Sequence, residues 1–245
     1  LRFLPTPALP LLLCLVASAL PAQENRYVGS QPCRGCHAPL FETFFRNPHF
    51  KSQVTETERS EQTCEGCHGP GLLHIRGGGD KTKIVAFSTL PAQATLDACL
   101  RCHSKDFGKA DIRRSPHTQA QVACTSCHSV HSAPETQYLL AKRQRDLCYG
   151  CHRNVEAEFS LPFKHRVNEG LIQCSDCHNP HGTEAASWRM AHRPRMVRQN
   201  LGGEQPCLRC HSELRGPFVF EHAAVRVDGC ETCHAPHGSM NTRLL

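Results

Sequence analysis

The residues of this chain best suited to chemistry are cysteines and histidines at one fixed spacing. Cys-x-x-Cys-His occurs eight times in 245 residues, and these copies hold all but one of the 17 cysteines. At this spacing two thiols can form thioethers to one porphyrin while the adjacent imidazole binds the iron, so the pattern predicts eight covalently bound haems c. Numbered in chain order, the motifs contain the cysteines Cys33, Cys36, Cys64, Cys67, Cys99, Cys102, Cys124, Cys127, Cys148, Cys151, Cys174, Cys177, Cys207, Cys210, Cys230 and Cys233. The proximal histidines that follow them are His37, His68, His103, His128, His152, His178, His211 and His234.

Other uses of paired cysteines explain this pattern less well. Structural zinc would join two Cys-x-x-Cys units in one tetrahedral site and would not need a histidine after every second cysteine. A disulfide scaffold would space its cysteines more variably and would not need the histidine either. Thioredoxin-like motifs occur once per domain on a βαβ pattern, which the sequence lacks.

Nine further histidines lie outside the motifs, and eight of them recur at regular places. In each pair of motifs, one spare histidine lies between the two motifs and another follows the second. Internal periodicity of this kind predicts four dihaem repeats at about 33–80, 99–135, 148–185 and 207–240. An isolated histidine would be interpreted as a solvated residue, but four copies of one arrangement favour ligation. The predicted distal ligands are His49, His74, His117, His131, His165, His181, His222 and His237, and only His192 is left over.

The position of the spare histidines limits which iron each can reach. A histidine three residues after a proximal histidine begins on the proximal side of that haem and cannot easily reach its opposite face. We therefore expect His131, His181 and His237 to bind the iron of a motif other than the one they follow. The spacing leaves open which iron each spare histidine takes.

Two histidines per iron would determine the function. A six-coordinate iron has no open position for a substrate, and two nitrogen donors set a lower potential than histidine with methionine. Met190, Met196 and Met240 lie off the repeat pattern and are poor ligand candidates. The pattern therefore predicts an electron carrier with no catalytic residue. The alternative is a multihaem oxidoreductase of the nitrite or hydroxylamine type, which would require at least one five-coordinate iron.

The chain is too short to build a side-chain core around each haem. Eight haems leave roughly 28 residues each, aromatic content is only 6%, and glycine and proline are frequent. The predicted fold class is a multihaem cytochrome c, mostly irregular with short α-helices, an elongated haem chain and little or no β-structure. Residues 139–159 and 183–199 are the best helix candidates, and 84–87 could form a short strand.

The N-terminal residues have the pattern of a secretory signal peptide. One arginine precedes an apolar run over 9–20, and Ala17-Ser18-Ala19 offers a cleavage site. The run is short for a membrane-spanning helix and is flanked by prolines. We therefore expect a signal peptide over 1–22, which removes Cys14, and an octahaem domain over 23–245. The expected location is periplasmic or outer-membrane-associated, with membrane association only through partners.

The formal net charge of +6 does not describe the haem-loaded protein. Two propionates on each haem would add roughly sixteen negative charges and make the net charge negative. Basic residues are therefore expected to act as counterions to propionates, and nucleic-acid binding is not expected. The basic segment 188–198, which includes His192, is either a docking surface for an acidic redox partner or a solvated linker.

The segment Cys64-Glu-Gly-Cys-His-Gly-Pro-Gly-Leu-Leu-His74 and the later Cys-x-x-Cys-His-x-Pro-His-Gly units resemble the periplasmic decahaem cytochromes of the MtrA/DmsE type. The resemblance covers nearly all of the chain after the signal segment. It implies a near-linear series of haems that passes electrons across the outer membrane, through a porin, to an outer-face multihaem cytochrome. An inner-membrane quinol-linked donor would lie upstream. The chain departs from this family in having eight motifs, the number found in octahaem components of porin–cytochrome complexes.

Two other roles for an electron carrier remain open at this point. The protein could be a free periplasmic shuttle or a subunit of a cytochrome filament. Filament subunits commonly borrow a distal histidine from their neighbour, whereas this chain has one spare histidine for every motif. The direction of electron flow and the terminal acceptor are not encoded in the motifs.

Overall fold

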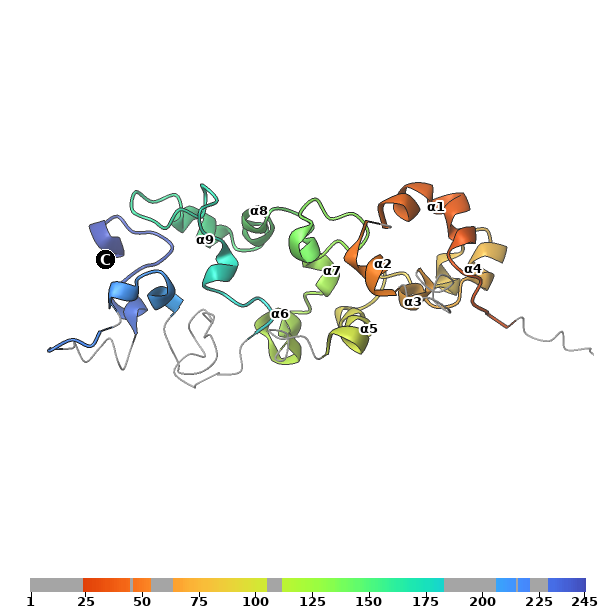
Figure 1. Cartoon of the computed structure of the whole chain (residues 1–245), viewed down its shortest axis with the longest axis horizontal. Coiled ribbons are helices and arrows are strands. Elements are labelled where there is room, and N and C mark those ends of the chain that lie inside the picture. Colours follow the sequence, from red (N-terminus) through yellow and green to blue (C-terminus); the bar gives the residue numbers. More distant parts are fainter. Residues whose placement is uncertain are drawn as a thin grey trace, which may run out of the picture.

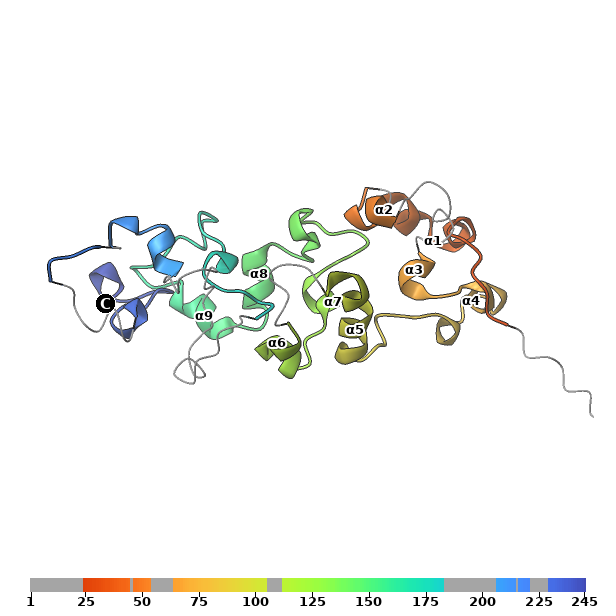
Figure 2. The same cartoon turned by 60° about the horizontal axis from the view of Figure 1, so that its bottom comes forward.

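Short helices joined by irregular segments follow one another along an elongated molecule (Figure 1). The computed structural model describes residues 24–44, 46–53, 64–104, 112–182, 206–214, 216–220 and 229–245. The chain advances along the long axis from α1 and α4 at one end toward the C-terminal turns at the other, doubling back locally, in both views (Figures 1 and 2). Motifs that are neighbours in the sequence are therefore neighbours in space.

The helices of the described residues are short, and none is long and apolar enough to cross a membrane. The α-helices are α1 (Gln31–Phe44), α2 (Pro48–Gln53), α3 (Glu65–His68), α4 (Leu72–Arg76), α5 (Ala92–His103), α6 (Pro116–Gln119), α7 (Cys124–Cys127), α8 (Gln144–Tyr149) and α9 (Arg153–Glu158). The 3₁₀ turns are η1 (Lys81–Lys83), η2 (Ile112–Arg114), η3 (Gln137–Leu139), η4 (Cys174–Asp176), η6 (Pro206–Arg209), η7 (Ser212–Leu214), η8 (Cys230–Thr232) and η9 (Thr242–Leu244).

Local sequence explains where several helices begin and bend. Ser115 caps α6 by accepting a hydrogen bond from the backbone N–H of Thr118, and Pro116 occupies the first helical position, where no N–H is needed. The run Ala-Gln-Ala-Thr-Leu at the start of α5 contains good helix formers. Helix α1 is kinked at His37, and Pro39 inside it removes a backbone donor. The kink separates the turn that carries the first motif from the rest of the helix.

The hydrophobic core is small, as expected for a chain wrapped around cofactors. Its main cluster consists of Tyr149, Phe159 and Val167, which join α8 and α9 to the loop that follows them. The described residues contain no β-strand, only isolated bridges such as the one between Phe163 and Ser239. The predicted fold class, irregular and helical with little β-structure, is therefore confirmed.

Two expected elements differ in the structure. The single helix expected over 139–159 is divided into η3, α8 and α9. The backbone leaves the helical region at Leu140 and Arg143, between η3 and α8, and at His152, between α8 and α9. The strand expected over 84–87 does not form. Its Val85 N–H donates to the carbonyl of His68, so this extended segment pairs with the second motif and not with another strand. The helix expected over 183–199 lies outside the described residues.

Candidate haem-binding site

Each Cys-x-x-Cys-His motif is placed on one turn of helix. In six of the motifs the N–H of the histidine donates to the carbonyl of the first cysteine, as in His68 to Cys64 at 3.1 Å and His178 to Cys174 at 2.9 Å. Residues three and four apart share a helix face, so both sulfurs and the imidazole are held on the same side. This is the arrangement that binding one porphyrin through two thioethers and one axial imidazole requires.

The first cysteines of the two motifs in each predicted repeat are in contact. Side-chain hydrogen bonds join Cys33 to Cys64, and the same contact recurs in the other three repeats. The two motifs of a repeat therefore meet through their first thiols. The other pairs are Cys99 with Cys124, Cys148 with Cys174, and Cys207 with Cys230.

Between repeats, the second cysteines are the near neighbours. Burial raises the pKa of the Cys67 thiol, and nearby Cys102 in the third motif adds to that rise. Cys151 acts in the same way on Cys127, and Cys210 on Cys177. First-cysteine contacts within repeats thus alternate with second-cysteine neighbours between repeats, and together they place the eight motifs in one row in chain order.

The histidines meet in pairs, each composed of one proximal and one spare histidine. Their ring centroids lie 5.8–6.4 Å apart in seven such pairs. Within the described ranges, no three side chains of His, Cys, Asp or Glu gather into a metal site. The pairs are His37 with His74, His68 with His131, His103 with His49, His128 with His181, His152 with His117, His178 with His237, and His211 with His165.

This separation suits an iron between the two rings. A metal–imidazole bond is about 2.0 Å long and the ring centre lies roughly 1 Å beyond the nitrogen, so two axial imidazoles have centroids about 6 Å apart. Aromatic rings can pack directly at similar distances. A direct packing preference would not select one proximal and one spare histidine seven times, so the set of pairs fits bis-histidine binding of haem iron.

The pairs connect neighbouring repeats by reciprocal exchange. The first repeat gives His49 to the third motif and receives His131 at the second motif. The second and third repeats exchange His117 and His181 in the same way, and the third and fourth exchange His165 and His237. His131, His181 and His237 therefore each lie beside a motif other than the one they follow.

The first motif is paired with a spare histidine from its own repeat. His74 lies beside His37, with ring centroids 6.4 Å apart. At the other end, His234 of the eighth motif and the spare His222 remain. His222 and His192 lie outside the described residues, and so do Met190 and Met196. Met240 is exposed.

Hydrogen bonds orient the rings for binding through Nε2. Nδ1 of His68 lies 2.6 Å from the carbonyl oxygen of Val85, and Nδ1 of His165 lies 2.7 Å from that of Pro236. Ligating histidines commonly donate their other ring N–H in this way, which fixes the tautomer and the ring plane. Four more make the same bond to a backbone carbonyl: His74, His117, His128 and His234.

The surroundings of His131 favour the protonation state that a ligand needs. Burial lowers its pKa, and the neighbouring His68 and His37 lower it further. A lower pKa favours the neutral imidazole, which is the form that binds metals.

Glu65, in the second motif, anchors the N-terminal segment. Its side chain is 2% exposed and accepts hydrogen bonds from the backbone N–H groups of Val28, Gly29 and Gly71 at 2.6–3.1 Å. A buried carboxylate is stable when several donors of this kind surround it. Glu65 thus ties the segment before the first motif to the Gly-Pro-Gly turn after the second. No sequence pattern indicates this role for Glu65, although the residue lies within the Cys-Glu-Gly-Cys-His-Gly-Pro-Gly segment.

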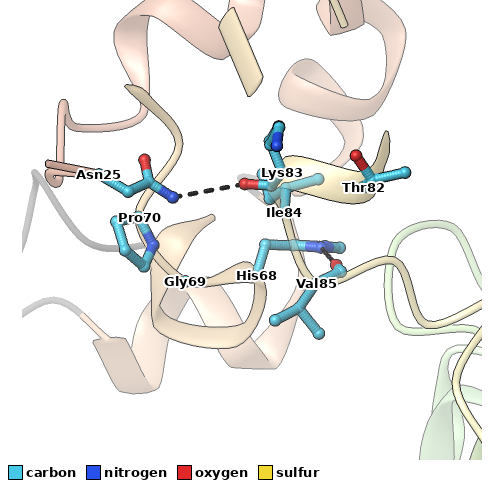
Figure 3. A pocket seen from close by; sticks show the side chains of 8 residues that line it. All are labelled: Asn25, His68, Gly69, Pro70, Thr82, Lys83, Ile84 and Val85. Atoms are coloured by element: carbon cyan, nitrogen blue, oxygen red, sulfur yellow. Dashed lines mark hydrogen bonds between the residues drawn. The ribbon is translucent and has the colours of Figure 1, made fainter. Parts of the chain in front are cut away.

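A groove beside His68 is lined by residues that connect the N-terminal segment to the second motif and η1 (Figure 3). The amide of Asn25 donates to the carbonyl of Lys83 at 3.4 Å, which joins the N-terminal segment to η1 (Figure 3). His68 faces Val85 across the groove through its Nδ1 bond. The groove therefore lies on the side of His68 that positions the ring, and we do not interpret it as a separate site.

Gly238 is required where the last segment crosses α9. A Cβ at this position would overlap the carbonyl oxygen of Glu158, and the neighbouring Ser239 pairs with Phe163 through two backbone hydrogen bonds. Nothing lies within 4 Å of a Cβ built at Gly35, in the first motif.

We expect Gly238→Ala to push residues 236–239 away from α9 and to pull His237 out of line with His178. The expected result is a partly high-spin haem and a stability loss of about 1–3 kcal/mol, measured by electron paramagnetic resonance and thermal unfolding. Gly35→Ala is the matched control and should leave both unchanged. If the two variants had the same spin state and the same stability, the close approach of Gly238 to the Glu158 carbonyl would be contradicted.

Comparison with known proteins gives matches over most of the chain. The family described as the doubled CXXCH motif matches residues 116–157 and 222–245, and the family of cytochrome c554 and c-prime matches residues 77–129. The chain is 33% identical to the multiheme cytochrome MtrA of Shewanella baltica, over 89% of this chain and 69% of that protein. It is 28% identical to the cytochrome c-type protein NrfB of Escherichia coli, over 55% of this chain and 74% of that protein.

Proposed function

The chain belongs to the family of multihaem c-type cytochromes that includes MtrA, and we propose that it is an octahaem electron carrier with no catalytic activity of its own. When bound, each haem supplies an iron that takes up and releases one electron. The chain would hold each haem by two cysteines and a proximal histidine, and would fill the remaining axial position with a spare histidine. Such irons offer no position to a substrate.

The pairing of proximal with spare histidines is the observation that carries this proposal. Seven of the eight motifs have a spare imidazole at the distance that a shared iron requires. Where Nδ1 of a paired histidine is hydrogen-bonded, as in His68 and His165, Nε2 is left to bind the iron. An enzyme would need at least one motif without such a partner.

We assign His222 to the eighth motif. Reciprocal exchange uses six spare histidines, and His74 serves the first motif within its own repeat. By the same logic, His222 would serve the eighth motif within the last repeat. Each of the eight irons would then be bound by two histidines from this chain.

We further propose that the protein is the periplasmic part of an outer-membrane porin–cytochrome conduit. Three features support this role: the kinship with MtrA, the secretory signal expected over 1–22, and the linear order of the motifs along an elongated molecule. A row that begins at one end of the molecule and finishes at the other is suited to passing electrons between partners at its two ends. The partners would be a quinol-linked donor on the inner side and an outer-face cytochrome beyond the porin.

Isolation of the native protein from membranes tests the conduit role. We expect it to co-purify with an outer-membrane porin after mild detergent extraction, and its deletion should abolish reduction of an extracellular acceptor. Recovery in the free periplasmic fraction would contradict the conduit and favour a shuttle. Recovery as sedimenting fibres would favour a filament subunit. Neither outcome would alter the haem ligands, which the spin state tests separately.

A further inference from the structure

One of the spare histidines is hydrogen-bonded to a carboxylate. Nδ1 of His237 lies 2.7 Å from Oε2 of Glu158, the last residue of α9. The six backbone-bonded histidines described above meet neutral carbonyl oxygens, and His49 meets the neutral side-chain oxygen of Asn47 at 3.1 Å. The contact at His237 therefore differs from these in charge and not only in geometry.

The surrounding structure fixes this contact. The ring of Phe159 packs against His237 with centroids 5.1 Å apart, and Phe159 itself is buried in the main hydrophobic cluster. Gly238 allows the backbone to press against Glu158, and the bridge between Phe163 and Ser239 holds the segment in place. The His237 side chain is only 21% exposed, whereas that of Glu158 is 45% exposed.

A carboxylate at this position changes the imidazole as a ligand. It draws the Nδ1 proton toward itself and makes Nε2 a stronger electron donor. A stronger donor and a nearby negative charge both favour the ferric over the ferrous state of the bound iron. Partial exposure of Glu158 weakens the effect of its charge through solvent, but the direct hydrogen bond is short enough to act on the ring itself.

We propose that Glu158 is a positioning residue that lowers the reduction potential of the haem at the sixth motif by acting on His237. This inference rests on the proposed function, because it takes His178 and His237 as the two ligands of that iron. As a consequence, the haems of the row would differ in reduction potential. The haem at the sixth motif, where the third repeat meets the fourth, would have a lowered potential. Electrons crossing this junction would meet an energetic step that the chain itself sets.

Glu158→Gln tests the proposal, because the amide oxygen still accepts the Nδ1 hydrogen bond while the charge is removed. We expect the reduction equilibrium constant of one haem to rise about tenfold, which corresponds to about 59 mV for one electron. The measurement is a spectroscopic redox titration of the purified haem-loaded protein. All haems should stay low-spin, which shows that the ligand has not been lost. Glu158→Ala is a second variant, and its potential should rise at least as far.

Glu213→Gln is the matched control. Glu213 lies 3.5 Å from Nδ1 of His211, beyond a good hydrogen bond, and both side chains are at least half exposed. Its removal should leave every potential unchanged within error. A shift for Glu213→Gln equal to that for Glu158→Gln would overturn the proposal, because it would reduce the effect to net charge.

His237→Met separates this inference from the ligand assignment. If His237 is a ligand, this variant should raise the potential of one haem and introduce the spectrum of histidine–methionine ligation. If the haem potential changed in His237→Met but not in Glu158→Gln, only the role of Glu158 would be overturned. If His237→Met left the potentials and the spectrum unchanged, His237 would not be a ligand, and both the ligand assignment and the role of Glu158 would be overturned.

Discussion

His131→Ala is expected to convert one haem of the eight from low-spin to high-spin. His131 lies beside His68 with ring centroids 5.9 Å apart, and its removal would leave the iron of the second motif with the proximal imidazole alone. Among the described residues no other spare histidine is paired with His68, so none is placed to replace His131 as the ligand. Electron paramagnetic resonance of the ferric protein should show about one eighth of the iron as high-spin, and the ferrous form should bind carbon monoxide at one site.

The matched control for this prediction is His192→Ala. His192 stands outside the repeat pattern, so its removal should leave all the haems low-spin and closed to carbon monoxide. A fully low-spin His131→Ala protein would contradict the assignment of His131 to the second motif. A high-spin signal from His192→Ala would show that the spare histidine of one motif had been misidentified.

Glu65→Ala is expected to destabilise the N-terminal repeat severely. The substitution would leave the backbone N–H groups of Val28, Gly29 and Gly71 buried without their acceptor. Each unsatisfied donor costs about 1–3 kcal/mol, so three of them should cost at least about 3 kcal/mol. Hydrogen exchange should show faster exchange of residues 26–30 and 64–72, together with a lower midpoint of thermal unfolding.

Thr125→Ala provides the comparison for Glu65→Ala. Thr125 occupies the equivalent place in the fourth motif, directly after the first cysteine, and its side chain is exposed. This variant should keep the stability and exchange pattern of the native protein. If Glu65→Ala also kept the native stability and exchange pattern, the hydrogen bonds that Glu65 accepts would have no structural role. Exchange that accelerated only in the third and fourth repeats would likewise contradict a local anchor.

The sequence predicted the attachment motifs and the fold class because both depend on local spacing. Four residues from first cysteine to histidine correspond to one helical turn, and the structure contains such a turn at each motif. The division of residues 139–159 into shorter helices was missed, although apolar spacing runs through them. The backbone leaves the helical region at His152, and helix propensity, which is a weak local preference, does not specify such a break.

The pairing of histidines could not be predicted from spacing. His49 and His74 flank the same motif, yet one lies beside the third motif and the other beside the first. Which motif a spare histidine reaches depends on how consecutive repeats are stacked, and this is a property of the three-dimensional arrangement. The steric argument for His131, His181 and His237 could exclude one partner but could not identify the other.

The residues that support the ligands could not be predicted from the sequence either. Glu158 is 79 positions from His237, and no motif connects them. Gly238 is part of a Pro-His-Gly unit, but the reason for its glycine is the carbonyl of Glu158 on another repeat. Contacts of this kind arise because each repeat completes the ligand set of its neighbour, so the support for one motif is encoded in the next repeat.

The haem count and spin state of the native protein, measured on one sample, test the central claim most directly. Pyridine haemochrome analysis with mass spectrometry should give eight covalently bound haems per chain. Electron paramagnetic resonance and magnetic circular dichroism should show only low-spin iron with two nitrogen ligands, and the reduced protein should not bind carbon monoxide. A count other than eight, or one high-spin iron in the native protein, would contradict a row of irons that are all closed by the chain's own histidines.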